Sequence, residues 1–281
     1  MRNLLSANFL RLRKSMLFWG CLILMLLLGA GFSLYCFLDR RTYETFGVGY
    51  VSNLDPVLFR YALLVGILMA VFVPLFFGME YSDGAIRNKL VVGHSRLSIY
   101  FANLITAVAA ALVFCAAYFL AALAAGLALA LPLQLGAAQI ALLVLSSLAL
   151  VAAFSALYTF VAMLCARKAG SAVACIMGVF LLLFAAIYID GRLKAPEFIS
   201  NYELSMNGQV SQSEPEPNPH YLRGAEREVY QFLNNFLPCC QASQYTSMDV
   251  ADPALLAAYS LGILAVSAGA GAALFRRKDL K

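Results

Sequence analysis

The sequence predicts an all-α membrane protein with six transmembrane helices, and composition is the first observation that leads to this fold class. Of its 281 residues, 62% are hydrophobic and only 12% are charged, and the mean hydropathy is +0.80. A water-soluble domain carries about 25% charged residues, so lipid rather than water suits this chain. The whole chain, 1–281, is expected to form one transmembrane domain.

The second observation is the length of the apolar runs. A run of roughly 18 or more apolar residues is long enough to cross a bilayer as a helix. The third run continues to Leu133, too far for one span, so the chain near Pro132 is expected to leave the membrane or to tilt. The predicted spans are 17–38, 57–79, 99–125, 140–165, 170–189 and 253–275.

The third observation is the distribution of charge, which sets the orientation. An even number of spans places both termini on one side. With both inside, the inner segments carry 13 basic and three acidic residues, and the outer segments carry seven basic and 12 acidic residues. Because basic residues accumulate on the cytoplasmic side, we expect both termini to be cytoplasmic in a multi-pass protein of the plasma membrane.

Residues 1–16 form the first element. Leu5, Phe9, Leu12 and Met16 recur on one helical face. This pattern predicts an amphipathic helix on the inner membrane surface, with its cations near anionic lipid headgroups. The alternative is an ordinary basic flank that only fixes topology. The following apolar stretch is longer than a signal-peptide core and no A-x-A-like cleavage site follows it, so we expect it to be retained.

Residues 190–252 form a long outer segment. Its stretch "SQSEPEPNPHYL", 211–222, predicts an irregular loop. The apolar residues Val229, Phe232, Leu233 and Phe236 then recur at helical spacing, which predicts an amphipathic helix that stops at Pro238 and lies on the outer membrane face or caps the bundle. Adjacent Cys239 and Cys240 could form only a strained disulfide with each other, and whether they form any stays open.

The sequence lacks the residues that several kinds of chemistry require. No Asp, Glu, Lys or His falls near the middle of a predicted span, and neither an H-E-x-x-H nor a G-x-x-x-x-G-K-[ST] motif occurs. We therefore expect no catalytic, metal-binding or cofactor-binding residues and no nucleic-acid partner. Any work the chain does is passive or is driven by another subunit.

The dense polar segment 80–96 stands between the second and third spans. Gly84 permits a turn and Gly93 suits a helix stop. Between them Ile86, Leu90 and Val91 share one side of a short helix and Arg87 and Asn88 another. Such a cytoplasmic helix is tied mechanically to both spans. The alternative is a solvated basic loop that only fixes topology.

This segment resembles the one that follows the second span in ABC-2-type permeases, the transmembrane subunits of ABC transporters. The likeness departs at Ala85, where threonine is common, and near Asn103, where lysine is common. The layout is also similar: a surface helix, six spans, an outer helical segment and a basic tail. The motif residues are Glu80, Gly84, Ile86, Arg87, Asn88, Lys89, Leu90, Gly93, Ser95 and Arg96.

The resemblance implies that 80–96 is a coupling helix, which docks on a separate ABC ATPase subunit that binds ATP and Mg²⁺. It also implies a second permease subunit, with a homodimer expected. Glu80 would bridge to the N-terminal helix or to the ATPase. Arg87, Lys89 and Arg96 would pair with the ATPase or with inner-leaflet phosphates. The implied coupling residues are Glu80, Gly84, Arg87, Asn88, Lys89, Gly93 and Arg96.

The expected function is therefore the permease part of an ATP-driven exporter of a peptide, a drug or another amphipathic cargo. A non-transporting membrane sensor or scaffold is the alternative. An ATPase with Walker motifs encoded next to this chain would favour the exporter.

Overall fold

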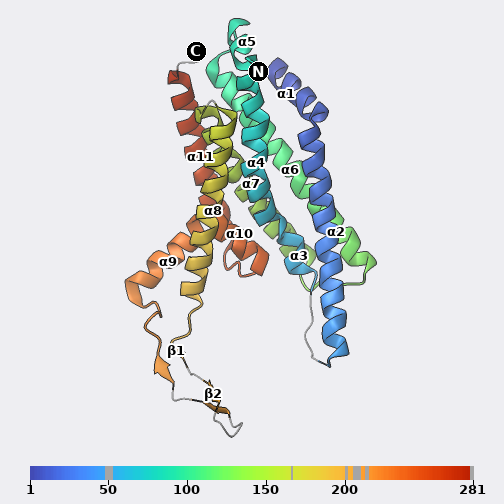
Figure 1. Cartoon of the computed structure of the whole chain (residues 1–281), viewed down its shortest axis with the longest axis vertical. Coiled ribbons are helices and arrows are strands. Elements are labelled where there is room, and N and C mark those ends of the chain that lie inside the picture. The colour runs from blue at the N-terminus through green and yellow to red at the C-terminus, as the bar shows by residue number, and fades with distance from the viewer. Residues whose placement is uncertain (48–52, 166, 200–201, 205–209, 213–214, 279–281) are drawn as a thin grey trace.

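The computed structural model describes residues 1–278 except 48–52, 166, 200–201, 205–209 and 213–214, and for 202–204 and 210–212 it describes the backbone alone. Long helices run side by side along the molecule, as Figure 1 shows. The elements are α1 (Arg2–Lys14), α2 (Met16–Thr45), α3 (Asp55–Phe59), α4 (Tyr61–Ser82), α5 (Ala85–Val91), α6 (Arg96–Ala128), α7 (Ala137–Cys165), α8 (Lys168–Leu193), β1 (Phe198–Ile199), β2 (Tyr202–Leu204), β3 (Val210–Gln212), β4 (Glu216–Pro217), α9 (Gly224–Phe236), α10 (Pro238–Ser247) and α11 (Pro253–Arg277).

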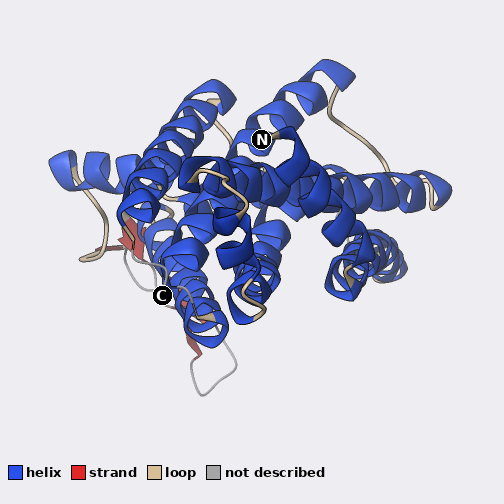
Figure 2. Ribbon diagram, turned by 90° about the horizontal axis from the view of Figure 1, so that it is seen from above, coloured by secondary structure: helices blue, strands red, loops and turns tan. Residues whose placement is uncertain are grey.

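Six helical segments in the described residues are long and apolar enough to cross a membrane: α2, α3 with α4, α6, α7, α8 and α11. This confirms the predicted fold class and the six spans. Helix α1, α5 and the end of α11 lie at one end of the bundle, and the strands lie at the other (Figure 1). Viewed from above, the strands are confined to one side of the bundle (Figure 2).

Helix α4 lies at the centre of the bundle. In its most apolar window 61% of the residues are buried, against 22% in α8 and in α11. The ring of Phe72 stacks on Phe76 and meets Phe114 of α6 edge-on. Neighbouring helices therefore bury most of this part of α4, whereas most of the corresponding parts of α8 and α11 are not buried.

The helix ends differ from those expected from hydropathy. Helix α2 continues to Thr45, seven residues beyond the predicted end at 38. The apolar run ends just before Asp39, but the backbone hydrogen bonds of a helix do not require apolar side chains. The ion pair between Arg40 and Glu44, at 2.9 Å and four residues apart, supports the extra turns.

The chain after α6 turns back on the bundle. Helix α6 ends at Ala128, before Pro132, and Ala130 has a positive φ of 52°. The buried carboxylate of Asp55 accepts hydrogen bonds from the backbone N–H groups of Gln134 and Leu135 at 3.0 and 3.1 Å. The start of α3 thus holds the loop that follows α6.

The irregular loop predicted for 211–222 is wrong in part. Strand β4 pairs with β1 in antiparallel register, and β3 pairs with β2. Pro217 does not prevent this pairing. Proline has no N–H to donate, and at the edge of a two-residue pairing no hydrogen bond from its nitrogen is required. Backbone pairing between segments far apart in sequence is not visible in local composition.

The predicted amphipathic helix is confirmed as α9, which ends at Phe236, before Pro238. The role of Pro238 differs from the prediction, since it also begins a further helix, α10, that was not predicted. Proline fits the first position of a helix because no intrahelical acceptor awaits its nitrogen. Helix α10 packs into the bundle and buries Cys239 and Cys240, and all seven cysteines, each within the described residues, are free thiols.

An exposed ion pair joins the end of α8 to Asp249, two residues after the end of α10. Lys194 Nζ lies 2.9 Å from Asp249 and 3.0 Å from Asp190. The hydrogen bond from Lys194 lowers the pKa of Asp249 below its usual 3.8. A carboxyl group whose pKa is lower in the folded protein than in the unfolded chain stabilises the folded state at pH values above its unfolded-state pKa. This stabilisation is lost as the pH falls through the folded-state pKa.

The Lys194→Gln variant is therefore expected to melt slightly below the wild-type protein at pH 6, and this difference is expected to be smaller at pH 3. Both groups are about half exposed, so the difference will be small. Thermal melting of the detergent-solubilised protein at the two pH values measures it. A melting difference that grows on acidification would contradict the pairing.

Candidate functional site

Helix α1 packs against α6 through one of its faces. Leu4, Asn8 and Leu12 are its buried residues. Of the predicted apolar face, Leu12 is buried, whereas Phe9 is 41% exposed and Met16, the first residue of α2, is 90% exposed. A face that lies on a membrane surface is exposed in the protein alone, so the placement of this face on the membrane stays a prediction. Polar Asn8 occupies the centre of the packed face, where it reaches a cluster of polar side chains.

That cluster, the polar junction, is centred on Glu80 in the last turn of α4. Its members are Asn8, Arg11, Glu80, Lys89, Asn103 and Thr106. The Glu80 side chain is completely buried. Its Oε1 accepts hydrogen bonds from Arg11 of α1 and, at 2.6 Å, from Lys89 Nζ of α5. Its Oε2 accepts one from Asn103 Nδ2 of α6 at 3.0 Å.

The two amides complete the polar junction. Asn8 Nδ2 donates to Asn103 Oδ1 at 2.8 Å, and Asn8 Oδ1 accepts from Lys89 Nζ at 3.1 Å. Asn103 is neutral, so Arg11 and Lys89 supply the cations of the polar junction. Four helices, α1, α4, α5 and α6, are therefore held by one buried carboxylate whose two oxygens both have partners.

Two glycines set the bounds of α5. Gly84 has φ +67° just before the helix and Gly93 has φ +93° just after it. This left-handed conformation favours glycine because it places no Cβ against the backbone. Ile86 is buried and Leu90 packs beside it. Val91, predicted on the same side, is 82% exposed, because a helix of two turns covers too little of the bundle to bury it.

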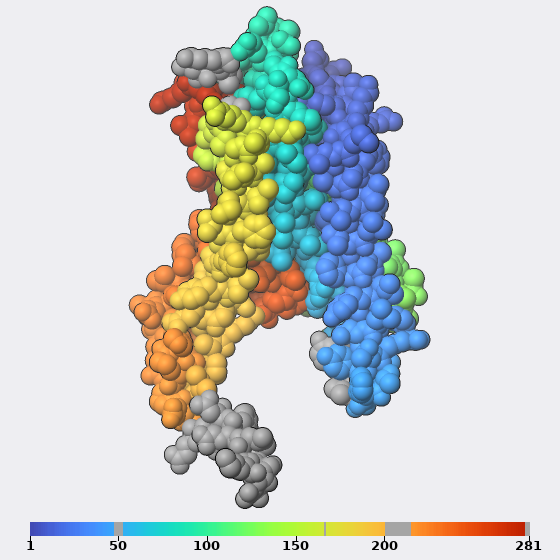
Figure 3. Space-filling view, viewed as in Figure 1, coloured from blue at the N-terminus to red at the C-terminus, as the bar shows by residue number. Residues whose placement is uncertain are grey.

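The outer side of α5 projects from the end of the molecule, as the space-filling view shows at the top (Figure 3). Arg87 and Asn88 are exposed, and so are Val91 and Val92, the latter at 75%. We call these four residues the α5 tip. The α5 tip thus presents two solvent-exposed valines beside a cation and an amide.

Arg96 is engaged within the chain. It donates to the backbone carbonyls of Arg276, at 3.2 Å, and Lys278 at the end of α11. Lys278 Nζ in turn donates to the carbonyls of Met163, at 3.2 Å, and Leu164 near the end of α7. Basic side chains thus cap the free carbonyls of two spans.

The implied coupling residues therefore fall into four groups. Glu80 and Lys89 meet in the polar junction, and Gly84 and Gly93 shape the backbone. Arg87 and Asn88 lie on the α5 tip, and Arg96 caps α11. Four further members of the polar junction, Asn8, Arg11, Asn103 and Thr106, were not predicted from the sequence as site residues. The signal for Asn8 was available, since it lies four residues after Leu4 and four before Leu12, a polar residue within an apolar stripe.

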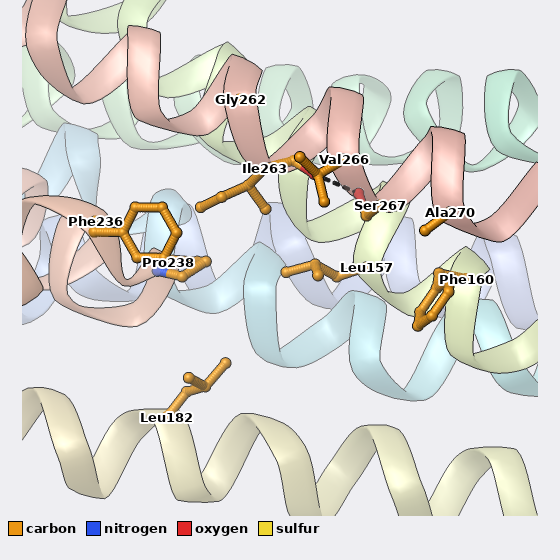
Figure 4. Close-up of a pocket in the computed structure, with 10 residues that line it drawn as sticks. All are labelled: Leu157, Phe160, Leu182, Phe236, Pro238, Gly262, Ile263, Val266, Ser267 and Ala270. Carbon is orange, nitrogen blue, oxygen red and sulfur yellow. Dashed lines mark hydrogen bonds between the residues drawn. The ribbon is translucent and has the colours of Figure 1, made fainter.

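A second feature is an apolar cavity of about 560 Å³ at span depth (Figure 4). Leu157 and Phe160 of α7 face Val266 and Ala270 of α11, and Leu182 of α8 lies across from them. Phe236 and Pro238, where α9 meets α10, close one end. Among the described lining residues Ser267 carries the one hydroxyl, which donates to the Ile263 carbonyl at 2.6 Å.

Six apolar spans with a buried polar junction at one end define a multi-pass membrane protein. A family model of ABC-2 family transporter proteins matches residues 4–185, about two thirds of the chain. The chain therefore belongs to the ABC-2 transporter family. The match includes α5 and the whole polar junction. A comparison with curated proteins found no match.

Proposed function

We propose that the chain is the permease subunit of an ATP-driven ABC exporter that moves an amphipathic cargo, such as a peptide or a drug, outward across the membrane. A separate ABC ATPase subunit would bind ATP and Mg²⁺. The observation that carries this proposal is the polar junction, which fastens α5 to three other helices while the α5 tip stays exposed.

The arrangement suits the transmission of force. A partner that docks on the α5 tip and moves would displace Lys89, and with it the buried carboxylate of Glu80. Separating the pair inside the protein is costly, because buried charges without partners lose several kcal/mol of solvation, on the order of 3–5 kcal/mol when one partner is removed. The helices α1, α4 and α6 would therefore follow α5 as one body.

The apolar cavity supports the choice of cargo. Among the described residues its lining contains no ionisable side chain, and the hydroxyl of Ser267 is already bonded. Such a lining suits a hydrocarbon or aromatic group better than a small ion. The excess of acidic residues in the segment 190–252 would attract a cationic peptide by long-range electrostatics, which is screened within about 8–10 Å at physiological salt.

The proposal includes the topology and the assembly. We place the chain in the plasma membrane with both termini cytoplasmic, 1–16 on the inner surface, 80–96 as the coupling segment and 190–252 outside, all within one domain, 1–281. A second permease subunit completes the transporter, most simply as a homodimer. The charge distribution and the exposed apolar surface of α8 support this arrangement.

Changing Val91 to Asp is expected to reduce co-purification of the ATPase subunit at least tenfold without lowering the melting temperature of the permease. Val91 is 82% exposed, so its replacement should not disturb the folded permease. At an interface with the ATPase, however, the aspartate would be a buried charge, which is costly. Pull-down of the ABC ATPase subunit by tagged permease measures the effect.

The matched control is Val229→Asp, which changes an exposed valine of α9 (56% exposed) at the opposite end of the bundle. It should leave co-purification unchanged. If no nucleotide-hydrolysing subunit binds the wild-type permease, the sensor or scaffold alternative takes the place of the exporter.

A further inference from the structure

A separate cavity of about 470 Å³ lies at the elbow between α1 and α2. Its charged lining consists of Arg11, Lys14, Glu80 and Asp83. Its apolar wall includes Met16 and Phe76. Since one side is charged and the other apolar, the cavity has the character of a site for an amphipathic molecule with a charged head.

The Arg11 guanidinium is only partly used by the protein. One of its nitrogens, Nη1, pairs with Glu80, and the group lies over the Phe76 ring at 4.1 Å from the centroid. The other two nitrogens, Nε and Nη2, are buried and have no acceptor in the described part of the chain. Buried N–H groups without an acceptor are costly, so an acceptor that is not part of the chain fits here.

Two further groups around the cavity also favour an anion. Lys14 is exposed and forms no ion pair or hydrogen bond with the described residues. The cavity also touches Met16 and Leu17, the first residues of the 30-residue helix α2, and the N-terminus of a long helix favours an anion. Glu80 is already balanced by Arg11 and Lys89, which leaves Asp83 as the opposing charge.

We propose that this elbow cavity binds a phosphate-bearing anion, namely the headgroup of an anionic membrane lipid. Arg11 and Lys14 contact the phosphate, and Met16 and Phe76 flank the apolar part of the lipid. The placement of α1 at a membrane surface is shared with the proposed function, but the binding needs no ATPase. Arg11 then joins the lipid to the polar junction, which makes the junction sensitive to lipid composition.

The single tryptophan of the chain makes this testable. Trp19 lies on the first turn of α2, is 48% exposed, and donates to the Arg13 carbonyl at 2.8 Å. The full-length permease without partners is titrated in micelles with phosphatidylglycerol brominated in its acyl chains, which quenches nearby tryptophan. We expect saturable quenching by this lipid and only weak, non-saturating quenching by brominated phosphatidylcholine.

Two variants separate a built site from general attraction. Lys14→Gln is expected to raise the half-saturating lipid fraction about tenfold, because it removes a charge-assisted contact. Arg13→Gln removes a neighbouring cation that does not line the cavity, and its effect should stay below about fivefold. Equal shifts in the two variants, or equal quenching by the two lipids, would overturn the proposal.

Inorganic phosphate at constant ionic strength distinguishes the source of the anion. We expect it to leave the quenching by phosphatidylglycerol unchanged. Displacement of the lipid by phosphate would overturn the assignment to a headgroup and give the site to the free ion. None of these results depends on ATPase binding, so failure here and failure of the proposed function are distinguishable.

Discussion

Replacing Glu80 with alanine is expected to destabilise the permease by about 3–5 kcal/mol, the usual cost of removing one partner of a buried ion pair. Arg11 and Lys89 would then lose the carboxylate on which both converge. Asn103 Nδ2 would lose its acceptor as well. Thermal melting of the purified protein measures the loss, and the transport-coupled ATPase activity of the complex should fall with it.

The control for this prediction is Asp83→Ala. Asp83 is an exposed carboxylate three residues further on, and it lies just past the end of α4. It should change the melting temperature little, since exposed charges contribute about 0–1 kcal/mol. If Glu80→Ala and Asp83→Ala melted alike and both retained coupled ATPase activity, the polar junction would not hold α5 in the way described.

Gly29→Ala is expected to destabilise the protein less than Glu80→Ala does, but still strongly for the addition of a single methyl group. A Cβ at Gly29 would lie 2.5 Å from the Tyr118 carbonyl oxygen and 3.1 Å from the Ala122 nitrogen, both in the backbone of α6. A backbone cannot move aside as a side chain can, so α2 would have to shift away from α6. Overpacking of this kind costs about 1–3 kcal/mol, and a lower melting temperature would show it.

Gly31→Ala provides the matched comparison, because no atom lies within 4 Å of the position of its Cβ. Alanine is the better helix former, so this variant should melt at the wild-type temperature or slightly above it. A decrease of equal size in both variants would show that loss of glycine itself, rather than contact between α2 and α6, is responsible.

The hydropathy of this sequence was enough to predict the spans, because each span must satisfy its own backbone in lipid and the runs are long. Gly84 and Gly93 predicted the bounds of α5, since both adopt positive φ there. The sequence did not predict that Lys89 turns inward and Arg87 outward. Both are basic residues on a seven-residue helix, and only the position of Glu80 separates their roles.

The unpredicted residues of the polar junction were missed because their contacts, too, form only in the folded bundle. Arg11 and Glu80 are 69 residues apart, and Asn8 and Asn103 are 95 apart, so no local pattern joins them. Helix α10 was missed because proline after an amphipathic helix is typical of a stop, and its continuation depends on burial against α4, α7 and α8. Local rules describe single helices, whereas these features arise from how the helices meet.

The polar junction also constrains the order of biosynthesis. Asn8 leaves the ribosome 95 residues before Asn103, a delay of about 5–20 s at ordinary rates of translation. During that interval the first helix of the nascent chain must wait without its amide partner. Insertion of the third span then completes the cluster, so α1 reaches its final position only after the chain has been made as far as α6.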